Sequence, residues 1–233
     1  LNRLVWHLGA VAAYFTFRFA VLGQYAFQAK TEFIFNPLAY SSFFERIFTA
    51  LKVLTLYLWK IFMPYRLSAD YSYDQIKIVA NLFSSPSALI GLAFLLLMLW
   101  IGYRILWMRK YSVLDRALIF LFLPYLMISN LFFPIGTIMA ERLMYFPSVG
   151  AVMVLSLGFE RLFKFSRKSG LALLVALMII YGFLIITQNR IRLSREALLT
   201  DILKKSPESV VAKTEYGILI LDKDKELAQK LSL

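Results

Sequence analysis

Residues 87–106 read SALIGLAFLLLMLWIGYRIL, an apolar stretch whose single charge, Arg104, stands near its end. About 20 apolar residues suffice to cross a bilayer as one helix. Four further stretches are long and apolar enough to do the same: 4–22, 117–140, 143–159 and 170–187. Trp and Tyr stand near several of their ends, as is typical of a membrane interface. The sequence therefore predicts an all-α, polytopic membrane protein.

A sixth stretch, 43–63, has two interpretations. Its polar residues recur at helical spacing and leave an apolar face of Ile47, Leu51, Leu54, Leu58 and Phe62. This pattern fits a helix that lies in the membrane interface. It also fits a span whose polar stripe faces a cavity inside the protein. We therefore expect five or six spans.

The composition supports the membrane assignment and excludes several classes of protein. Of the 233 residues, 60% are hydrophobic and 17% are charged, whereas soluble domains carry about 25% charged residues. The net charge is +12, but most of the excess lies before residue 188, where basic residues flank the predicted spans. We therefore predict no nucleic-acid partner. With one histidine and no cysteine, the chain offers no recognisable metal site.

Basic residues in two short loops orient the chain. The loop after 87–106 and the loop before 170–187 are the most basic: Arg104, Arg109, Lys110 and Arg116 in one, Arg161, Lys164, Arg167 and Lys168 in the other. Two spans separate them, so both loops lie on one side, which the positive-inside rule makes cytoplasmic. Segments 64–86, 134–142 and everything after residue 188 are then expected on the non-cytoplasmic side.

The composition changes after residue 188, which divides the chain into a membrane domain, 1–188, and a soluble helical region, 189–233. We expect helices at 191–205, 209–221 and 225–231, with a stop at 206–208 and a turn at 222–224. Pro207, Tyr216 and Gly217 have the spacing of a tetratricopeptide unit. A generic helical hairpin is the alternative. Since one unit cannot bury its own apolar face, further repeats are expected to follow.

Segment 133–148 reads FPIGTIMAERLMYFPS and contains two adjacent charged residues, Glu141 and Arg142, between two prolines. Arg142 and Tyr145 are three residues apart and would share a helix face. A guanidinium binds phosphate in a forked geometry, so Arg142 with Tyr145 is a candidate phosphate clamp, next to Glu141. The alternative is a pair of charges that anchors the headgroup zone.

A second cluster, 64–74, contains Asp70 and Asp74 with Tyr71 and Tyr73 between them. Aromatic rings stack on sugar rings, and carboxylates accept hydroxyl protons. A solvated turn is the alternative interpretation. Both clusters are expected to face the same non-cytoplasmic compartment.

These two clusters resemble a known family. The sequence FFPIGTIMAERLMYFPS at 132–148 looks like the signature of the transmembrane and tetratricopeptide-repeat-containing O-mannosyltransferases. YLWKIFMPYRLSADYS at 57–72 resembles the other marker of that family, and Asn36-Pro37-Leu38-Ala39 also fits. The resemblance covers nearly the whole chain.

The resemblance implies a GT-C-type membrane glycosyltransferase that transfers a sugar, mannose in animal members, from a polyprenyl-phosphate donor to Ser or Thr of a protein acceptor. It places the catalytic acidic loop before Leu1, so the catalytic residue is unknown here. Glu141, Arg142 and Tyr145 are candidates for the donor site, and Arg66 and Asp70 for the lining of the same cavity. Whether the reaction needs a divalent metal is left open. The repeats are expected to bind the protein acceptor.

We further expect a bacterial homologue in the inner membrane, with the repeats outside, because loops are short and cysteine is absent. The chain begins with Leu1 rather than Met, so we expect the carboxyl-terminal membrane half of a longer enzyme. One alternative is a non-catalytic membrane-anchored scaffold whose repeats recruit extracytoplasmic partners. Another alternative is an O-antigen ligase or polymerase, but proteins of that class lack the signature found here at 132–148.

Overall fold

The computed structural model describes residues 2–23, 31–64, 67–73, 75–108 and 112–231. Contacts divide the chain into two units, Leu1–Thr31 and Glu32–Leu233. The first unit contains helix α1 (Asn2–Leu22), which confirms the helix expected at 4–22. The predicted boundary at residue 188 does not coincide with this division and stays a prediction.

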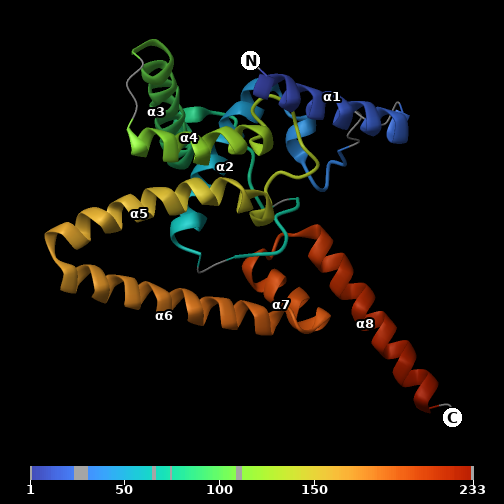
Figure 1. The fold of residues 1–233 in the computed structure, drawn as a ribbon. Helices are drawn as coiled ribbons and strands as arrows, with labels where there is room; N and C mark the ends of the chain where they lie inside the picture. Colours follow the sequence, from blue (N-terminus) through green and yellow to red (C-terminus); the bar gives the residue numbers. More distant parts are fainter. Residues whose placement is uncertain (1, 24–30, 65–66, 74, 109–111, 232–233) are drawn as a thin grey trace. The chain divides into compact units, whose positions relative to one another are not determined.

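The described residues form eight α-helices and no strand, which confirms the all-α class. The second unit holds α2 (Phe43–Phe62), α3 (Pro86–Met108), α4 (Val113–Ile128), α5 (Pro147–Phe165), α6 (Arg167–Ile191), α7 (Arg195–Lys205) and α8 (Val210–Leu231) (Figure 1). Within the described chain, α3 and α6 are long and apolar enough to cross a membrane. The expected total of five or six spans is not confirmed.

The span expected at 117–140 is wrong in its second half. Helix α4 ends at Ile128, and the chain continues to Ala140 without helix. Asn130 adopts a left-handed backbone conformation, with φ of 58°, which a helix does not tolerate. Ile138 and Met139 are buried by protein. The second half of this uncharged stretch is therefore a partly buried loop rather than the continuation of a helix.

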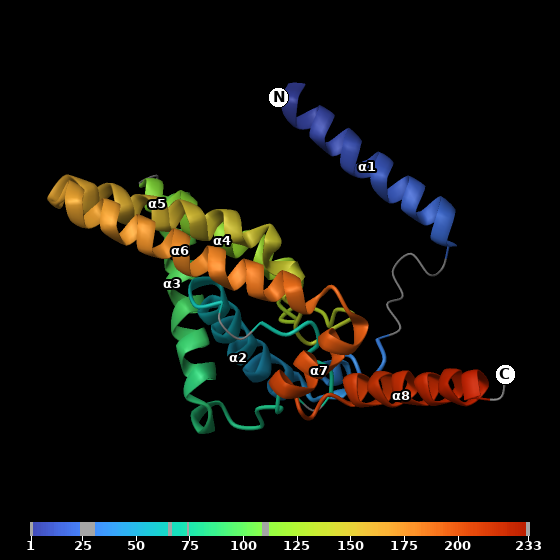
Figure 2. The same ribbon diagram turned by 90° about the horizontal axis from the view of Figure 1, so that it is seen from below.

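Two glycines allow close helix packing. A Cβ on Gly91 of α3 would lie 2.0 Å from the Leu51 carbonyl oxygen of α2, and one on Gly150 of α5 would lie 2.2 Å from the Leu121 amide nitrogen of α4. The backbones of α2 and α3, and of α4 and α5, therefore touch. The main core lies between these helices, and Tyr57 and Tyr125 are buried there edge to face. Figure 2 shows α5 and α6 running side by side.

Helix α2 begins with a capping box formed by Ser42 and Glu45. Its buried residues are Thr49, Ala50, Leu51, Val53, Leu54 and Tyr57. The predicted apolar face is thus only partly the buried one, because Ala50 and Val53 face the protein while Phe62 is exposed. The buried face of α2 packs against other parts of the protein. Whether it spans the membrane or lies in the interface stays a prediction.

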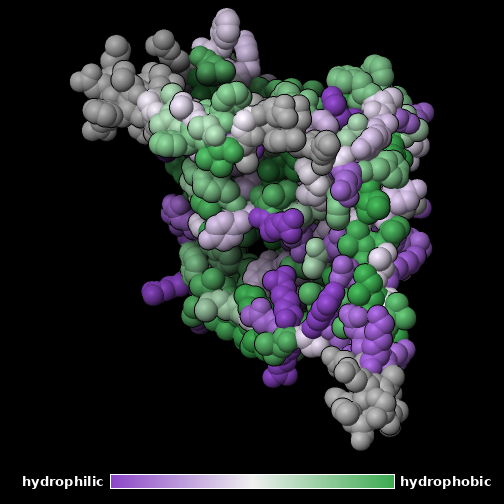
Figure 3. All heavy atoms as spheres, turned by 90° about the vertical axis from the view of Figure 1, so that its right-hand side faces the viewer, coloured by the Kyte–Doolittle hydropathy of each residue, from purple (hydrophilic) through white to green (hydrophobic). Residues whose placement is uncertain are grey.

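The C-terminal region differs from the expected three helices. Helix α8 continues through 222–224, so the predicted turn there is wrong. The helical pair is instead α7 with α8, joined at the stop expected at 206–208, and Leu199, Ile202 and Ala212 form its core. Three favourable helix formers, Leu221, Lys223 and Lys225, surround the two aspartates and allow the helix to continue. In the space-filling view, hydrophilic side chains gather around these C-terminal helices (Figure 3).

Candidate functional site

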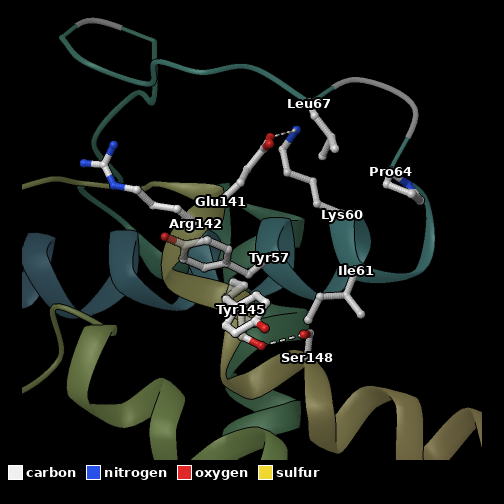
Figure 4. A pocket seen from close by; sticks show the side chains of 10 residues that line it. Tyr57, Lys60, Ile61, Pro64, Leu67, Glu141, Arg142, Tyr145 and Ser148 are labelled. Carbon is white, nitrogen blue, oxygen red and sulfur yellow. Dashed lines mark hydrogen bonds and ion pairs between the residues drawn. The ribbon is translucent and has the colours of Figure 1, made fainter. Parts of the chain in front are cut away.

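A cavity of about 270 Å³ opens between the end of α2, the loop that follows it, and the 3₁₀ turn η4 (Glu141–Tyr145) (Figure 4). We call it the donor-side cavity, after the role that the family resemblance predicts for Glu141, Arg142 and Tyr145. It is lined by Tyr57, Lys60, Ile61, Pro64, Leu67, Glu141, Arg142, Met144, Tyr145 and Ser148. Charged residues and apolar side chains therefore meet in one small hollow.

Tyr57 fixes the start of η4. Its hydroxyl accepts a hydrogen bond from the Ala140 amide at 2.8 Å and donates one to the Ala140 carbonyl at 3.1 Å. Pro147 begins α5 directly after the turn, since proline is tolerated in a first helical turn. In a 3₁₀ turn, residues three apart lie above one another. Arg142 and Tyr145 therefore share the cavity side, although the turn is 3₁₀ rather than α-helical.

Two buried asparagines hold the loop before η4. The Asn36 amide donates to the Asn130 side-chain oxygen at 2.9 Å and to the Ile135 carbonyl at 2.7 Å. Asn130 in turn donates to the Ile138 carbonyl at 3.2 Å and accepts from the Ile135 amide at 2.8 Å. Buried polar groups need such partners. The motif that begins at Asn36 thus supports the motif at 132–148.

Glu141 is the most constrained charge of the donor-side cavity. Its Oε1 atom accepts hydrogen bonds from the Tyr71 hydroxyl and, at 3.0 Å, from the Ser68 amide, and lies 3.5 Å from Lys60 Nζ. Burial, and secondarily the hydrogen bond to Glu141, raise the pKa of Tyr71 well above its ordinary value. Tyr71 therefore remains protonated and keeps donating to Glu141. In Figure 4, Lys60 and Glu141 point toward one another.

Arg142 has a different environment. It is exposed, and within the described residues it makes no ion pair with a carboxylate. In Figure 4 it extends on the opposite side of Glu141 from Lys60. Since Lys60 and Glu141 neutralise each other, Arg142 leaves the lining with a net positive charge. Tyr145, whose surface is 83% exposed, lies on the same turn. This arrangement suits an anionic ligand.

The structure brings together three of the five predicted site residues: Glu141, Arg142 and Tyr145. Asp70 is not among the residues that line this cavity. Its carboxylate instead accepts hydrogen bonds from the Ser72 hydroxyl at 2.6 Å and the Ser209 hydroxyl at 2.5 Å. Arg66 lies outside the described residues, as does Asp74. The functional roles assigned to these residues remain predictions.

Sequence reasoning missed most of the lining as site residues, including Tyr57, Lys60 and Pro64. All three lie in the marker at 57–72, at intervals of three and four residues that place them on one side of a helix end. This periodicity could have identified them. Ser148 was also missed; its hydroxyl donates to the Tyr145 carbonyl at 2.6 Å.

The three segments expected on one side of the membrane meet at this site. Ser68 belongs to the first and Glu141 to the second, and they share the hydrogen bond described above. The Ser206 hydroxyl, from the third, donates to the Ser68 hydroxyl at 3.1 Å, and the Val210 amide donates to the Tyr73 carbonyl at 3.0 Å. The start of α8 therefore docks directly on the loop after α2. Within the described residues, no cluster of three or more His, Cys, Asp or Glu could hold a metal ion.

Sequence comparison finds relatives over most of the chain. The protein O-mannosyl-transferase TMTC1 of Mus musculus is 27% identical over 80% of this chain, and 21% of that relative is covered. Tmtc3 of Drosophila melanogaster is 30% identical over 54% of the chain and 14% of the relative. TMTC4 of Homo sapiens is 42% identical over 31% of the chain and 10% of the relative.

The chain therefore spans about a fifth of the length of the TMTC1 relatives that it matches. No protein-family model matches it, and no solved structure does. The relatives nevertheless carry the name that the two motifs suggested. By sequence similarity, this chain is thus a relative of the transmembrane and tetratricopeptide-repeat-containing O-mannosyltransferases.

Proposed function

We propose that this chain is part of an integral-membrane glycosyltransferase of the GT-C type. The enzyme transfers a sugar, mannose by analogy with its named relatives, from a polyprenyl-phosphate donor to Ser or Thr of a protein. Arg142 binds the donor phosphate, with Tyr145 on the same turn. The observation that carries this proposal is an exposed arginine without a described carboxylate partner at the mouth of an apolar-walled cavity.

We assign the lipid part of the donor to a second hollow. It holds about 210 Å³ and shares Pro64 and Leu67 with the donor-side cavity. Its other wall is the C-terminal part of α6, including Leu184 and Ile185. Since α6 is long and apolar enough to span a membrane, a polyprenyl chain could lie along it. The phosphate would then be at Arg142 and the chain in the bilayer.

In the proposed reaction the acceptor hydroxyl oxygen attacks the anomeric carbon and the bond from that carbon to the phosphate oxygen breaks. The anomeric configuration inverts, and the phosphate leaves with the bonding electron pair. A carboxylate outside this chain takes the hydroxyl proton. Arg142 stabilises the charge that grows on the phosphate. Glu141 acts as a structural partner of Lys60, because Tyr71 and Ser68 already occupy it.

In this proposal the α7–α8 pair helps to position the protein acceptor. It docks on the same loop that closes the cavity, through Ser206 and Ser209. A protein bound by helices that continue from α8 would thus be held near the donor. We propose that this face is the non-cytoplasmic one and that the membrane is the inner membrane of a bacterium.

The test is an assay of the full-length protein with polyprenyl-phosphate mannose and a Ser/Thr-containing acceptor peptide. We expect transfer, and we expect Arg142→Ala to weaken donor affinity. Absence of transfer from any polyprenyl-linked sugar would contradict the proposal and favour a non-catalytic repeat scaffold. Thermal unfolding of the same preparation shows whether a loss of transfer comes from misfolding.

A further inference from the structure

A third cavity, of about 310 Å³, is lined by Lys60 on the side away from the donor-side cavity. We call it the lysine cavity. Its lining residues are Lys52, Leu56, Lys60, Ser68, Tyr71, Gln75, Ile76, Met139 and Lys205. Three ammonium groups from two helices thus border one space: Lys52 and Lys60 lie on α2, and Lys205 is the last residue of α7.

Positive charge is concentrated around the lysine cavity. The charge of Lys205 acts on Lys60, and that of Lys77 acts on Lys52. Lys60 lies 3.5 Å from the Glu141 carboxylate, and Lys205 lies 2.8 Å from that of Asp201. Neither carboxylate belongs to a residue that lines the cavity. The like charges repel each other unless an anion lies between them.

The partners of Lys52 leave its charge unbalanced. Its Nζ donates to the Lys77 carbonyl at 3.0 Å, and within the described residues no carboxylate forms an ion pair with it. Within the described residues, the printed ion pairs of the three lysines involve two carboxylates, those of Glu141 and Asp201. An oxyanion would supply the missing negative charge.

One buried polar atom of the lining points to the same conclusion. The Gln75 side-chain oxygen is buried without a hydrogen-bond partner in the described part of the chain, whereas the buried Lys205 Nζ has the Asp201 carboxylate 2.8 Å away. Buried polar groups in folded proteins nearly always have a partner, so each such case needs an explanation. A bound anion would accept hydrogen bonds from Lys205 and from the Gln75 amide once that amide turns its NH₂ group inward.

We propose that the lysine cavity binds a phosphate group, either free or on a lipid headgroup. A phosphate offers three or four acceptor oxygens in a tetrahedral arrangement, enough for ammonium groups that approach from α2 and from α7. Leu56 and Met139 add apolar wall to the cavity, and contacts between charges are stronger beside apolar groups than in bulk water. The bound phosphate would tie α7 to α2. This inference does not rest on the proposed transferase function.

The lysine cavity also adjoins the donor-side cavity. Lys60 lines both, and its carboxylate partner Glu141 lines only the donor-side cavity. A phosphate in the lysine cavity competes with Glu141 for Lys60, so the two cavities are coupled. By linkage, any effect of one ligand on the other is reciprocal.

The test measures phosphate binding to the full purified chain in detergent by ³¹P line broadening. Inorganic phosphate and dihexanoyl phosphatidic acid are titrated separately, with a neutral dihexanoyl diacylglycerol as a blank. The variants are Lys52→Gln and Lys205→Gln. Lys204→Gln is the matched control, because Lys204 is exposed on the same helix and lines neither cavity.

We expect binding of at least one of the two phosphates and a loss of about tenfold in affinity for each of the two variants, since each removes one charge-assisted hydrogen bond. Lys204→Gln should change affinity by no more than about twofold. Binding of free phosphate indicates a free oxyanion, and binding of phosphatidic acid alone indicates a headgroup. The proposal is overturned if neither binds, or if Lys52→Gln and Lys205→Gln behave like Lys204→Gln.

Misfolding is checked separately with Lys52→Arg and Lys205→Arg, which keep the charge and should retain binding. Failure of this proposal is distinguishable from failure of the transferase proposal. Neither Lys52 nor Lys205 lines the donor-side cavity, so donor affinity in the absence of phosphate should be unchanged in all of these variants.

Discussion

The ammonium group of Lys60 lies 3.5 Å from the carboxylate of Glu141, and this ion pair stands between the two cavities. Both side chains are mostly buried, with 17% and 19% of their surface exposed. Glu141→Gln keeps an oxygen for Tyr71 and Ser68 but removes the negative charge that faces Lys60. We expect a loss of about 1–3 kcal/mol in the free energy of unfolding.

A double-mutant cycle separates this charge effect from packing. Lys60→Met added to Glu141→Gln should recover part of the loss, because the ammonium group that faced Glu141 is removed as well. Thermal unfolding of the wild type, both single variants and the double variant provides the measurement. Strictly additive losses would show that the pair makes no energetic contribution.

The Asn36–Asn130 pair should control the loop that leads into η4. Asn130→Ala removes four hydrogen bonds in the buried network and places alanine at a φ of 58°. We expect a loss of about 2–4 kcal/mol, which combines unmade hydrogen bonds with backbone strain. The control is Asn81→Ala, since Asn81 is exposed and caps a short 3₁₀ turn. Equal losses in the two variants, measured by unfolding, would contradict the account.

Close helix packing depends on Gly91 and Gly150. Alanine at either position would clash with the backbone of the neighbouring helix, so we expect losses of about 1–3 kcal/mol or more. Gly182 and Gly102 have open space where a Cβ would lie. Their replacement by alanine should be neutral or stabilise by up to about 1 kcal/mol. Unfolding midpoints of the four variants test this contrast.

Asp70 should hold the α7–α8 pair on the loop after α2. Asp70→Ala removes the carboxylate that accepts from the buried hydroxyls of Ser72 and Ser209, which then have, among the described residues, only each other as acceptors, at a cost of about 1–3 kcal/mol. We expect faster tryptic cleavage at Arg192, between α6 and α7. Asp222→Ala, on the exposed part of α8, is the control. Unchanged cleavage in Asp70→Ala would mean that other contacts hold the pair.

Helices and their caps could largely be predicted from apolar stretches and local signals, whereas the route of the chain between them could not. The uncharged stretch 117–140 satisfies every hydropathy criterion for a span. What ends α4 is a long-range pairing, because Asn130 reaches Asn36 across 94 positions of sequence. No local pattern encodes that contact. The same holds for Asp70, whose partner Ser209 lies 139 positions away.

The candidate site divides in the same way. Glu141, Arg142 and Tyr145 are neighbours in sequence, so one motif sufficed to find them. Lys60 approaches from α2, and only the fold places it 3.5 Å from Glu141. The continuity of α8 was missed for a different reason. Asp222 and Asp224 are residues typical of turns, but a helix can carry them on its exposed side.

The central claim is that Arg142 binds the donor phosphate. The most direct measurement is the affinity of the full-length protein for polyprenyl-phosphate mannose, with Arg142→Ala compared with Arg167→Ala, an exposed arginine at the start of α6. The account predicts a loss of at least about tenfold for Arg142→Ala, with unchanged thermal unfolding and no loss for Arg167→Ala. Equal donor affinity in the wild type and Arg142→Ala would contradict it.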